Sequence, residues 1–124
     1  MSVTDTHKVS KVIILKSDRC LLLCREDGKG WELPGGHLNL RESYTDGAIR
    51  ECLEETGIRL TLLRLIYKEK NYNLFKSKPR VTKIKLSDEH TDYTWVNHKQ
   101  IHKLKLSNST KRNLRRILDV ISLD

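Results

Sequence analysis

The sequence has few of the residues that mark disulfide-rich, fibrous or membrane-spanning proteins. Its 124 residues include three cysteines, two prolines, one methionine and one phenylalanine. The cysteine count is odd, and Cys20 and Cys24 bound an apolar run, so reduced core thiols are the expected state. No apolar run approaches the roughly 20 residues of a transmembrane helix. We therefore expect a protein without membrane contact.

Residues 1–8 also lack the apolar core of a secretory signal, which indicates a cytoplasmic protein. The length of 124 residues predicts a single domain that spans residues 1–124. A domain of this size buries roughly two-thirds of its unfolded surface, so its core requires neither a disulfide nor a metal.

Acidic residues are absent from one long stretch and concentrated in another. The formal net charge is +8, and residues 98–118 contain no Asp or Glu. Five acids lie within residues 42–55: Glu42, Asp46, Glu51, Glu54 and Glu55. A basic protein with one acidic cluster suggests a polyanionic ligand that meets the cluster through a bound cation. The charge pattern alone favours a simpler alternative, a solvated basic surface without a partner.

Apolar runs that alternate with polar turns predict a mixed sheet between helices. Short runs bounded by turn residues are typical of buried strands. Strands are expected at residues 9–15, 20–24, 31–33, 59–66, 71–75, 81–86 and 93–96. The first two should pair around residues 16–19, and 71–75 and 81–86 should form a hairpin around residues 76–79. Residues 34–36 should break regular structure. Since strands and helices alternate, the predicted fold class is α/β.

Two helices are predicted. The first lies between Ser43, which with Asp46 fits a capping box, and Gly57, which fits a left-handed C-terminal stop. Its apolar stripe consists of Ile49, Cys52, Leu53 and Thr56. The second begins at about Ser109 and exposes four cations beside its apolar face: Lys111, Arg112, Arg115 and Arg116. Those cations favour a solvated helix face over a nucleic-acid site.

Three carboxylates share one face of the first predicted helix. Glu51, Glu54 and Glu55 are spaced i, i+3 and i+4, so their like charges repel. A divalent cation would remove that penalty, and Mg²⁺ prefers carboxylate oxygens while keeping waters for substrate phosphates. For these three residues alone, an exposed acidic helix face is the simpler interpretation.

The longer pattern around these acids is far more specific. Gly36 is followed by five residues and Glu42, then by seven residues and the run RECLEETGI from Arg50 to Ile58. This segment resembles the Nudix box, G-x5-E-x7-R-E-U-x-E-E-x-G-U with U apolar, at every specified position. A chance match in a chain of this length is on the order of one in ten million. Residues 31–35 before the box, and residues 86–90 and 93–96 after it, also look like the family.

The resemblance to MutT-like Nudix pyrophosphohydrolases implies a fold, a metal and a set of roles. The fold would be an α/β/α sandwich with a central mixed β-sheet between helices. Glu51, Glu54 and Glu55 would ligate Mg²⁺, or Mn²⁺ as a substitute, with the Gly36 carbonyl joining them. Arg50 would pair with Glu42 and hold the loop against the helix.

The resemblance leaves the base that accepts the proton of the attacking water open. Glu51 is the first candidate, and Glu89, in the loop before Trp95, is the second. For Glu89, an ordinary loop acid is the alternative.

The implied reaction is hydrolysis of the diphosphate linkage of a nucleoside diphosphate derivative. The first expectation is a (deoxy)nucleoside triphosphate or a dinucleoside polyphosphate, with release of a nucleoside monophosphate. ADP-ribose, a nucleotide sugar or a capped RNA 5′ end is the alternative, and a non-catalytic nucleotide- or RNA-binding module is the rival of another class. Arg25 is a candidate contact to the phosphates, and Tyr72 and Phe75 are candidates to stack on the base. For the two aromatic residues, core or hairpin packing is the alternative. Many relatives are dimers, which leaves a homodimer open.

Overall fold

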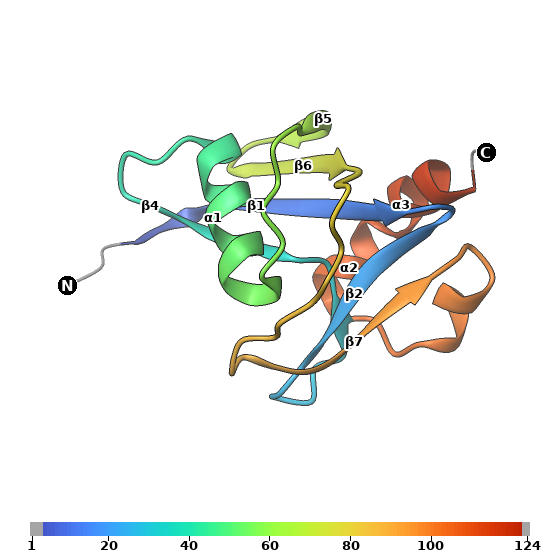
Figure 1. The fold of residues 1–124 in the computed structure, drawn as a ribbon. Helices are drawn as coiled ribbons and strands as arrows, with labels where there is room; N and C mark the ends of the chain where they lie inside the picture. The colour runs from blue at the N-terminus through green and yellow to red at the C-terminus, as the bar shows by residue number, and fades with distance from the viewer. Residues whose placement is uncertain (1–3, 123–124) are drawn as a thin grey trace.

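The computed structural model describes residues 4–122, which form a strongly curved sheet with helices on both sides (Figure 1). The elements in chain order are β1 (Thr4–Lys16), β2 (Arg19–Arg25), β3 (Trp31–Glu32), β4 (Gly35–Asn39), α1 (Tyr44–Thr56), β5 (Arg64–Glu69), β6 (Tyr72–Ser77), β7 (His90–Val96), the 3₁₀ helix η1 (Gln100–Lys103), α2 (Asn108–Arg112) and α3 (Leu114–Ile121). No helix in this part of the chain is long and apolar enough to cross a membrane.

The long strand β1 organises the sheet. It pairs antiparallel with β2 and with β4, and parallel with β6. Strand β2 also pairs with β3 and β7, and β5 forms an edge beside β6. The predicted pairing of the first two strands is confirmed, and the sheet is mixed, as the α/β class requires.

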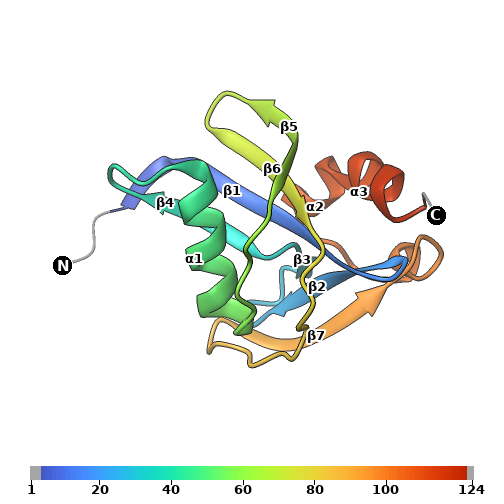
Figure 2. The same cartoon turned by 45° about the horizontal axis from the view of Figure 1, so that its top comes forward.

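Two apolar clusters lie on opposite faces of this sheet. Val12 and Ile14 pack toward α1 with Ala48 and Cys52, whereas Ile13 packs toward α3 with Ile117 and Ile121. The alternation follows from the two-residue period of a strand. Figure 2 shows α1 on one side of the sheet and α2 and α3 on the other. The predicted α/β/α sandwich is therefore confirmed.

The ends of α1 are those that the sequence predicts. The Ser43 side chain accepts a hydrogen bond from the Asp46 amide at 3.0 Å. Gly57 adopts φ 75° and donates its amide to the Leu53 carbonyl at 2.9 Å. These caps satisfy backbone groups that a helix end otherwise leaves unpaired.

The predicted hairpin of residues 71–75 and 81–86 is wrong. Strand β6 instead lies between β1 and β5, and the hairpin is β5–β6, which turns at Asn71 with φ 62°. Residues 78–87 contain no regular element, and they follow the end of α1 through bonds from the Lys85 and Ser87 amides to the Thr56 and Glu55 carbonyls. The strand predicted at residues 59–66 is β5, which begins later, at Arg64.

Two further expectations are corrected. Gly35 and Gly36 do not end regular structure, because they begin β4, where they pair with Lys11 and Ser10 of β1. The last helix is interrupted at Asn113, whose side-chain amide donates to the Ser109 carbonyl and to the Tyr72 hydroxyl, both at 2.9 Å. A side chain that bonds nearby backbone in this way competes with helix continuation.

Candidate active site

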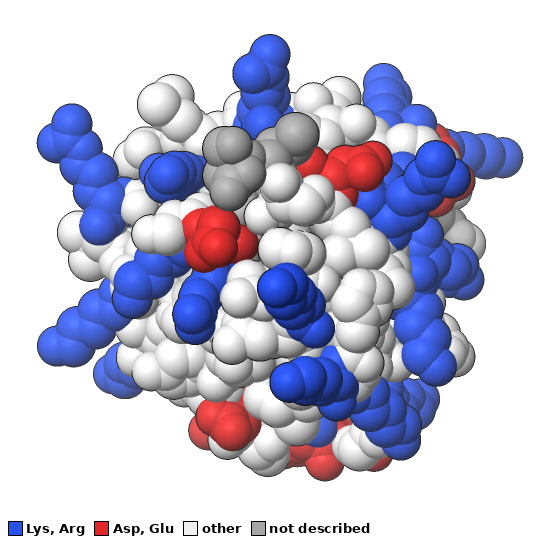
Figure 3. All heavy atoms as spheres, turned by 90° about the vertical axis from the view of Figure 1, so that its right-hand side faces the viewer, with Lys and Arg blue, Asp and Glu red and all other residues white. Residues whose placement is uncertain are grey.

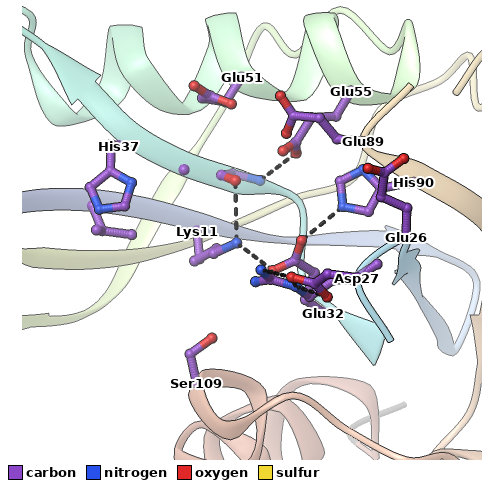
Figure 4. A pocket seen from close by; sticks show the side chains of 14 residues that line it. Lys11, Glu26, Asp27, Glu32, His37, Glu51, Glu55, Glu89, His90 and Ser109 are labelled. Atoms are coloured by element: carbon purple, nitrogen blue, oxygen red, sulfur yellow. Dashed lines mark hydrogen bonds and ion pairs between the residues drawn. The ribbon is translucent and has the colours of Figure 1, made fainter. Parts of the chain in front are cut away.

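An acidic cavity of about 670 Å³ opens between α1, the start of β4 and the loop before β7 (Figure 4). Six carboxylate side chains line it: Glu26, Asp27, Glu32, Glu51, Glu55 and Glu89. The Lys and Arg side chains in its wall are Lys11 and Arg25. A cavity of this sign in a chain of net charge +8 suits a cation, which can in turn bind an anionic ligand.

Helix α1 and β4 meet at Glu55. Its buried carboxylate accepts a hydrogen bond from the Gly35 amide at 2.8 Å. Burial raises the pKa of Glu55 to about 7, although the charge of Lys11 and the Gly35 hydrogen bond act in the opposite direction. A bound cation would stabilise the charged form of this carboxylate.

The Glu51 carboxylate lies against the backbone of β4. A Cβ atom placed on Gly36 would lie 3.0 Å from the Glu51 carboxyl carbon, so a glycine allows this approach. Burial raises the pKa of Glu51, Arg50 opposes the shift, and the charges of Glu54 and Glu89 add to it. Glu51, Glu55 and the Gly36 backbone therefore share one wall of the cavity.

Arg50 fastens the preceding loop to α1. Its Nε and Nη2 atoms donate to the two oxygens of Glu42 at 2.8 and 2.9 Å, and Nη1 donates to Glu51 at 2.9 Å. Nη2 also reaches the His37 carbonyl at 3.0 Å. The predicted pairing of Glu42 with Arg50 is confirmed. The forked ion pair holds the guanidinium in place, and its third nitrogen, Nη1, then orients the Glu51 carboxylate.

The other two predicted acids lie differently. Glu54 points outward, with a side chain 58% exposed and 3.3 Å from Arg50 Nη1. Glu89 lines the same cavity as Glu51 and Glu55. Within residues 4–122, no three His, Cys, Asp or Glu side chains already converge in a metal-ligand geometry. Glu51, Glu55 and Glu89 thus line the cavity, whereas Glu54 is not among its lining residues.

Among the predicted substrate contacts, the structure brings Arg25 to the cavity. Its guanidinium is 2.5 Å from Asp27 and 3.3 Å from Glu32. The prediction that Phe75 contacts the base is contradicted: the residue is 5% exposed and packs in the core under α1, which was the alternative. Tyr72 is not among the residues that line the cavity: it packs against the cluster on the α3 side of the sheet, and its hydroxyl accepts a hydrogen bond from Asn113.

Sequence reasoning missed three residues of the cavity floor. Lys11 Nζ lies 3.4 Å from Glu32, and Glu32 accepts a hydrogen bond from His90 Nε2 at 2.7 Å. Burial would raise the pKa of Glu32, but the bond from His90 and the charges of Lys11 and Arg25 lower it to about 2. A single lysine inside the apolar run of residues 9–15 was the available signal, since a buried ammonium requires a partner.

Basic side chains dominate the face that carries α2 and α3 (Figure 3). Arg116 stacks its guanidinium 3.5 Å from the centre of the Tyr67 ring. Lys111, Arg112 and Arg115 lie on the α2–α3 segment around the buried Ile117. A positive surface near an acidic cavity attracts anionic ligands toward the molecule.

Both the sequence and the sandwich fold have counterparts among known proteins. The NUDIX domain model matches residues 5–117, and the chain belongs to this family. A MutT-like protein of Streptomyces ambofaciens is 36% identical over 94 residues, which cover 71% of this chain and 61% of that protein.

A second sequence relative and a solved structure are also similar to this chain. The asymmetrical bis(5′-nucleosyl)-tetraphosphatase of Mus musculus is 35% identical over 92 residues, covering 61% of this chain and 62% of that enzyme. The solved MutT protein of Methanosarcina mazei superposes with a TM-score of 0.69 at 27% identity over 94% of each chain. The match thus spans about three-fifths of the length of the Streptomyces ambofaciens and Mus musculus proteins.

Proposed function

We propose that this chain is a Mg²⁺-dependent pyrophosphohydrolase that cleaves the diphosphate linkage of a nucleoside diphosphate derivative. One observation carries the proposal: the carboxylates of Glu51 and Glu55 and the backbone of Gly36 meet at an acidic cavity of a basic protein. Buried like charges are costly without a counter-charge, so their retention side by side indicates a ligand that supplies one.

The donor set fits a hard divalent cation. Glu51, Glu55 and the Gly36 carbonyl would hold Mg²⁺, with Mn²⁺ as a substitute, because oxygen ligands suit both ions. Glu54 would join them after its side chain parts from Arg50 and turns toward the cavity. When bound, the ion neutralises phosphate charge and lowers the pKa of a coordinated water.

The protein's own residues would orient the reactants. Arg50 holds Glu51 in place, and Glu51 is our first candidate to accept the proton of the attacking water. Glu89 is the second candidate, since its side chain lines the same cavity. Arg25 would contact a phosphate after it parts from Asp27.

For the substrate, we propose a (deoxy)nucleoside triphosphate or a dinucleoside polyphosphate, with a nucleoside monophosphate as one product. The names of the MutT-like and tetraphosphatase relatives support this choice. ADP-ribose, nucleotide sugars and capped RNA are the competing substrates in the test.

Removal of divalent metal is expected to abolish turnover. The protein would be mixed with Mg²⁺ and a panel of nucleoside triphosphates, dinucleoside polyphosphates, ADP-ribose, nucleotide sugars and capped RNA, and monophosphate release would be followed chromatographically. EDTA should reduce release to background, and added Mg²⁺ or Mn²⁺ should restore it. RNA binding that weakens with salt, without turnover of any compound, would instead establish a non-catalytic binding module.

The substitution Gly36→Ala is expected to separate activity from folding. The new Cβ meets the end of the flexible Glu51 side chain, so the carboxylate moves while the backbone stays in place. Because a displacement of about 1 Å costs on the order of a hundredfold in rate, kcat should fall by about that factor. Thermal unfolding should match the wild-type protein. Wild-type kcat in this variant would remove Glu51 from the reaction centre.

A further inference from the structure

A largely buried cation lies in the middle of β1, in the wall of the candidate metal site. The Lys11 side chain is 11% exposed and belongs to the same strand as the core residues Val12, Ile13 and Ile14. Lysine is almost never this buried unless its ammonium is fully paired. Its position in the sheet is therefore tied to the groups that it binds.

The Lys11 ammonium has three acceptors within hydrogen-bond distance, and all of them belong to residues 32–35. Nζ lies 3.1 Å from the Leu33 carbonyl, 3.2 Å from the Gly35 carbonyl and 3.4 Å from Glu32 Oε1. An ammonium offers three N–H donors, so it can satisfy each acceptor. Figure 4 shows Lys11 and its contact to Glu32 below Glu55 and Glu51. Lys11, itself in the cavity wall, thus binds the segment from Glu32 to Gly35 that leads into β4.

The bond to the Gly35 carbonyl has a direct consequence for its neighbour. That carbonyl belongs to the planar peptide that joins Gly35 to Gly36, so holding it fixes the plane from which Gly36 continues. The Gly35 amide is held from the other side by Glu55 at 2.8 Å. Lys11 and Glu55 together clamp Gly35, and Gly36 is then placed against Glu51.

We infer that Lys11 is a positioning residue of the metal site: it orients the Gly35–Gly36 peptide so that Gly36 faces the cavity beside Glu51 and Glu55. This inference rests on the proposed function, since it assigns Lys11 a role toward the metal. An ion pair with Glu32 that serves folding alone is the competing interpretation. Glu32 keeps His90 and Arg25 as partners when Lys11 is removed.

Electrostatics and positioning predict opposite signs for one measurement. A positive charge beside the carboxylates repels a divalent cation, so its removal alone would strengthen metal binding. Loss of the clamp on the Gly35 carbonyl would weaken metal binding, because the ligands are then no longer preorganised. The sign of the change in Mn²⁺ affinity therefore separates the two effects.

The test compares Lys11→Met, which keeps most of the aliphatic stem, with Lys16→Met, which removes an exposed lysine from the same strand. Mn²⁺ binding would be measured without nucleotide by the loss of the free-ion EPR signal, and folding by circular dichroism. We expect Lys11→Met to raise the Kd for Mn²⁺ by about 10–100-fold, the range for residues that orient metal ligands. Lys16→Met should leave the Kd unchanged.

Equal or tighter Mn²⁺ binding by a folded Lys11→Met protein would overturn the inference. Should that variant fail to fold, Lys11→Gln decides by the same criterion, because its neutral amide retains donors for the carbonyls but is shorter. A wild-type protein that binds no Mn²⁺ and hydrolyses no nucleotide would refute the proposed function itself, which is a separate outcome.

Discussion

Glu54→Gln is expected to abolish metal-dependent hydrolysis in a protein that still folds. The amide has the shape of the carboxylate but neither its charge nor its affinity for a divalent cation. We expect kcat to fall by about 10²–10³-fold, the loss seen when one group that stabilises transition-state charge is removed. The side chain is 58% exposed, so the free energy of unfolding should change by less than about 0.5 kcal/mol.

Initial rates of monophosphate release and a thermal melt would test this pair of effects. Asp46→Asn is the matched control, because Asp46 is an exposed acid on the first turn of the same helix. The control should keep wild-type turnover. Undiminished turnover of Glu54→Gln would remove Glu54 from the metal site.

Gly35→Ala is expected to damage the fold itself. A Cβ atom at this position would lie 2.1 Å from the Ser10 carbonyl oxygen and 2.8 Å from the Lys11 Cα, and φ is +126°. These are backbone atoms of a central strand, so they cannot move aside as a side chain can. Steric overlap and backbone strain together should cost roughly 3–5 kcal/mol.

The consequence is large because small domains are stable by only about 5–15 kcal/mol. The melting temperature should fall by at least roughly 10 °C. Gly28→Ala provides the control, since Gly28 has φ +79° but no atom within 4 Å of its added Cβ. It should lose about 1 kcal/mol from backbone strain alone. A Gly35→Ala protein that melts no lower than Gly28→Ala would contradict this view of the β1–β4 contact.

The two glycines that begin β4 therefore have different structural roles. Gly35 allows β4 to cross β1 closely, whereas Gly36 allows the Glu51 carboxylate to approach the backbone. Substitution of the first is predicted to affect stability, and substitution of the second to affect catalysis. The contrast provides an internal check on the proposed site.

Local signals made part of this structure predictable. The Ser43 cap, the Gly57 stop and the acidic spacing of α1 all lie within the one continuous segment from Ser43 to Gly57, so the sequence defines the helix without tertiary information. The pairing of Glu42 with Arg50 was accessible only through the resemblance of the box, since nothing in the residues between them requires it.

Long-range pairing was not predictable in the same way. The parallel register of β1 with β6 joins residues far apart in the chain, and it decides that Phe75 faces the core under α1. Because strand side chains alternate, a shift of one residue would reverse that outcome. The contact of His90 with Glu32, 58 residues apart in sequence, has no local signature either.

Crystals of the protein grown with Mn²⁺ and a non-hydrolysable nucleoside triphosphate analogue would test the central claim most directly. Anomalous scattering locates manganese independently of any assumption about its ligands. We predict a peak bonded to the carboxylates of α1 and the Gly36 carbonyl, with the analogue's phosphates on its open side. Carboxylates turned to solvent, with no manganese between them and the nucleotide, would contradict the account.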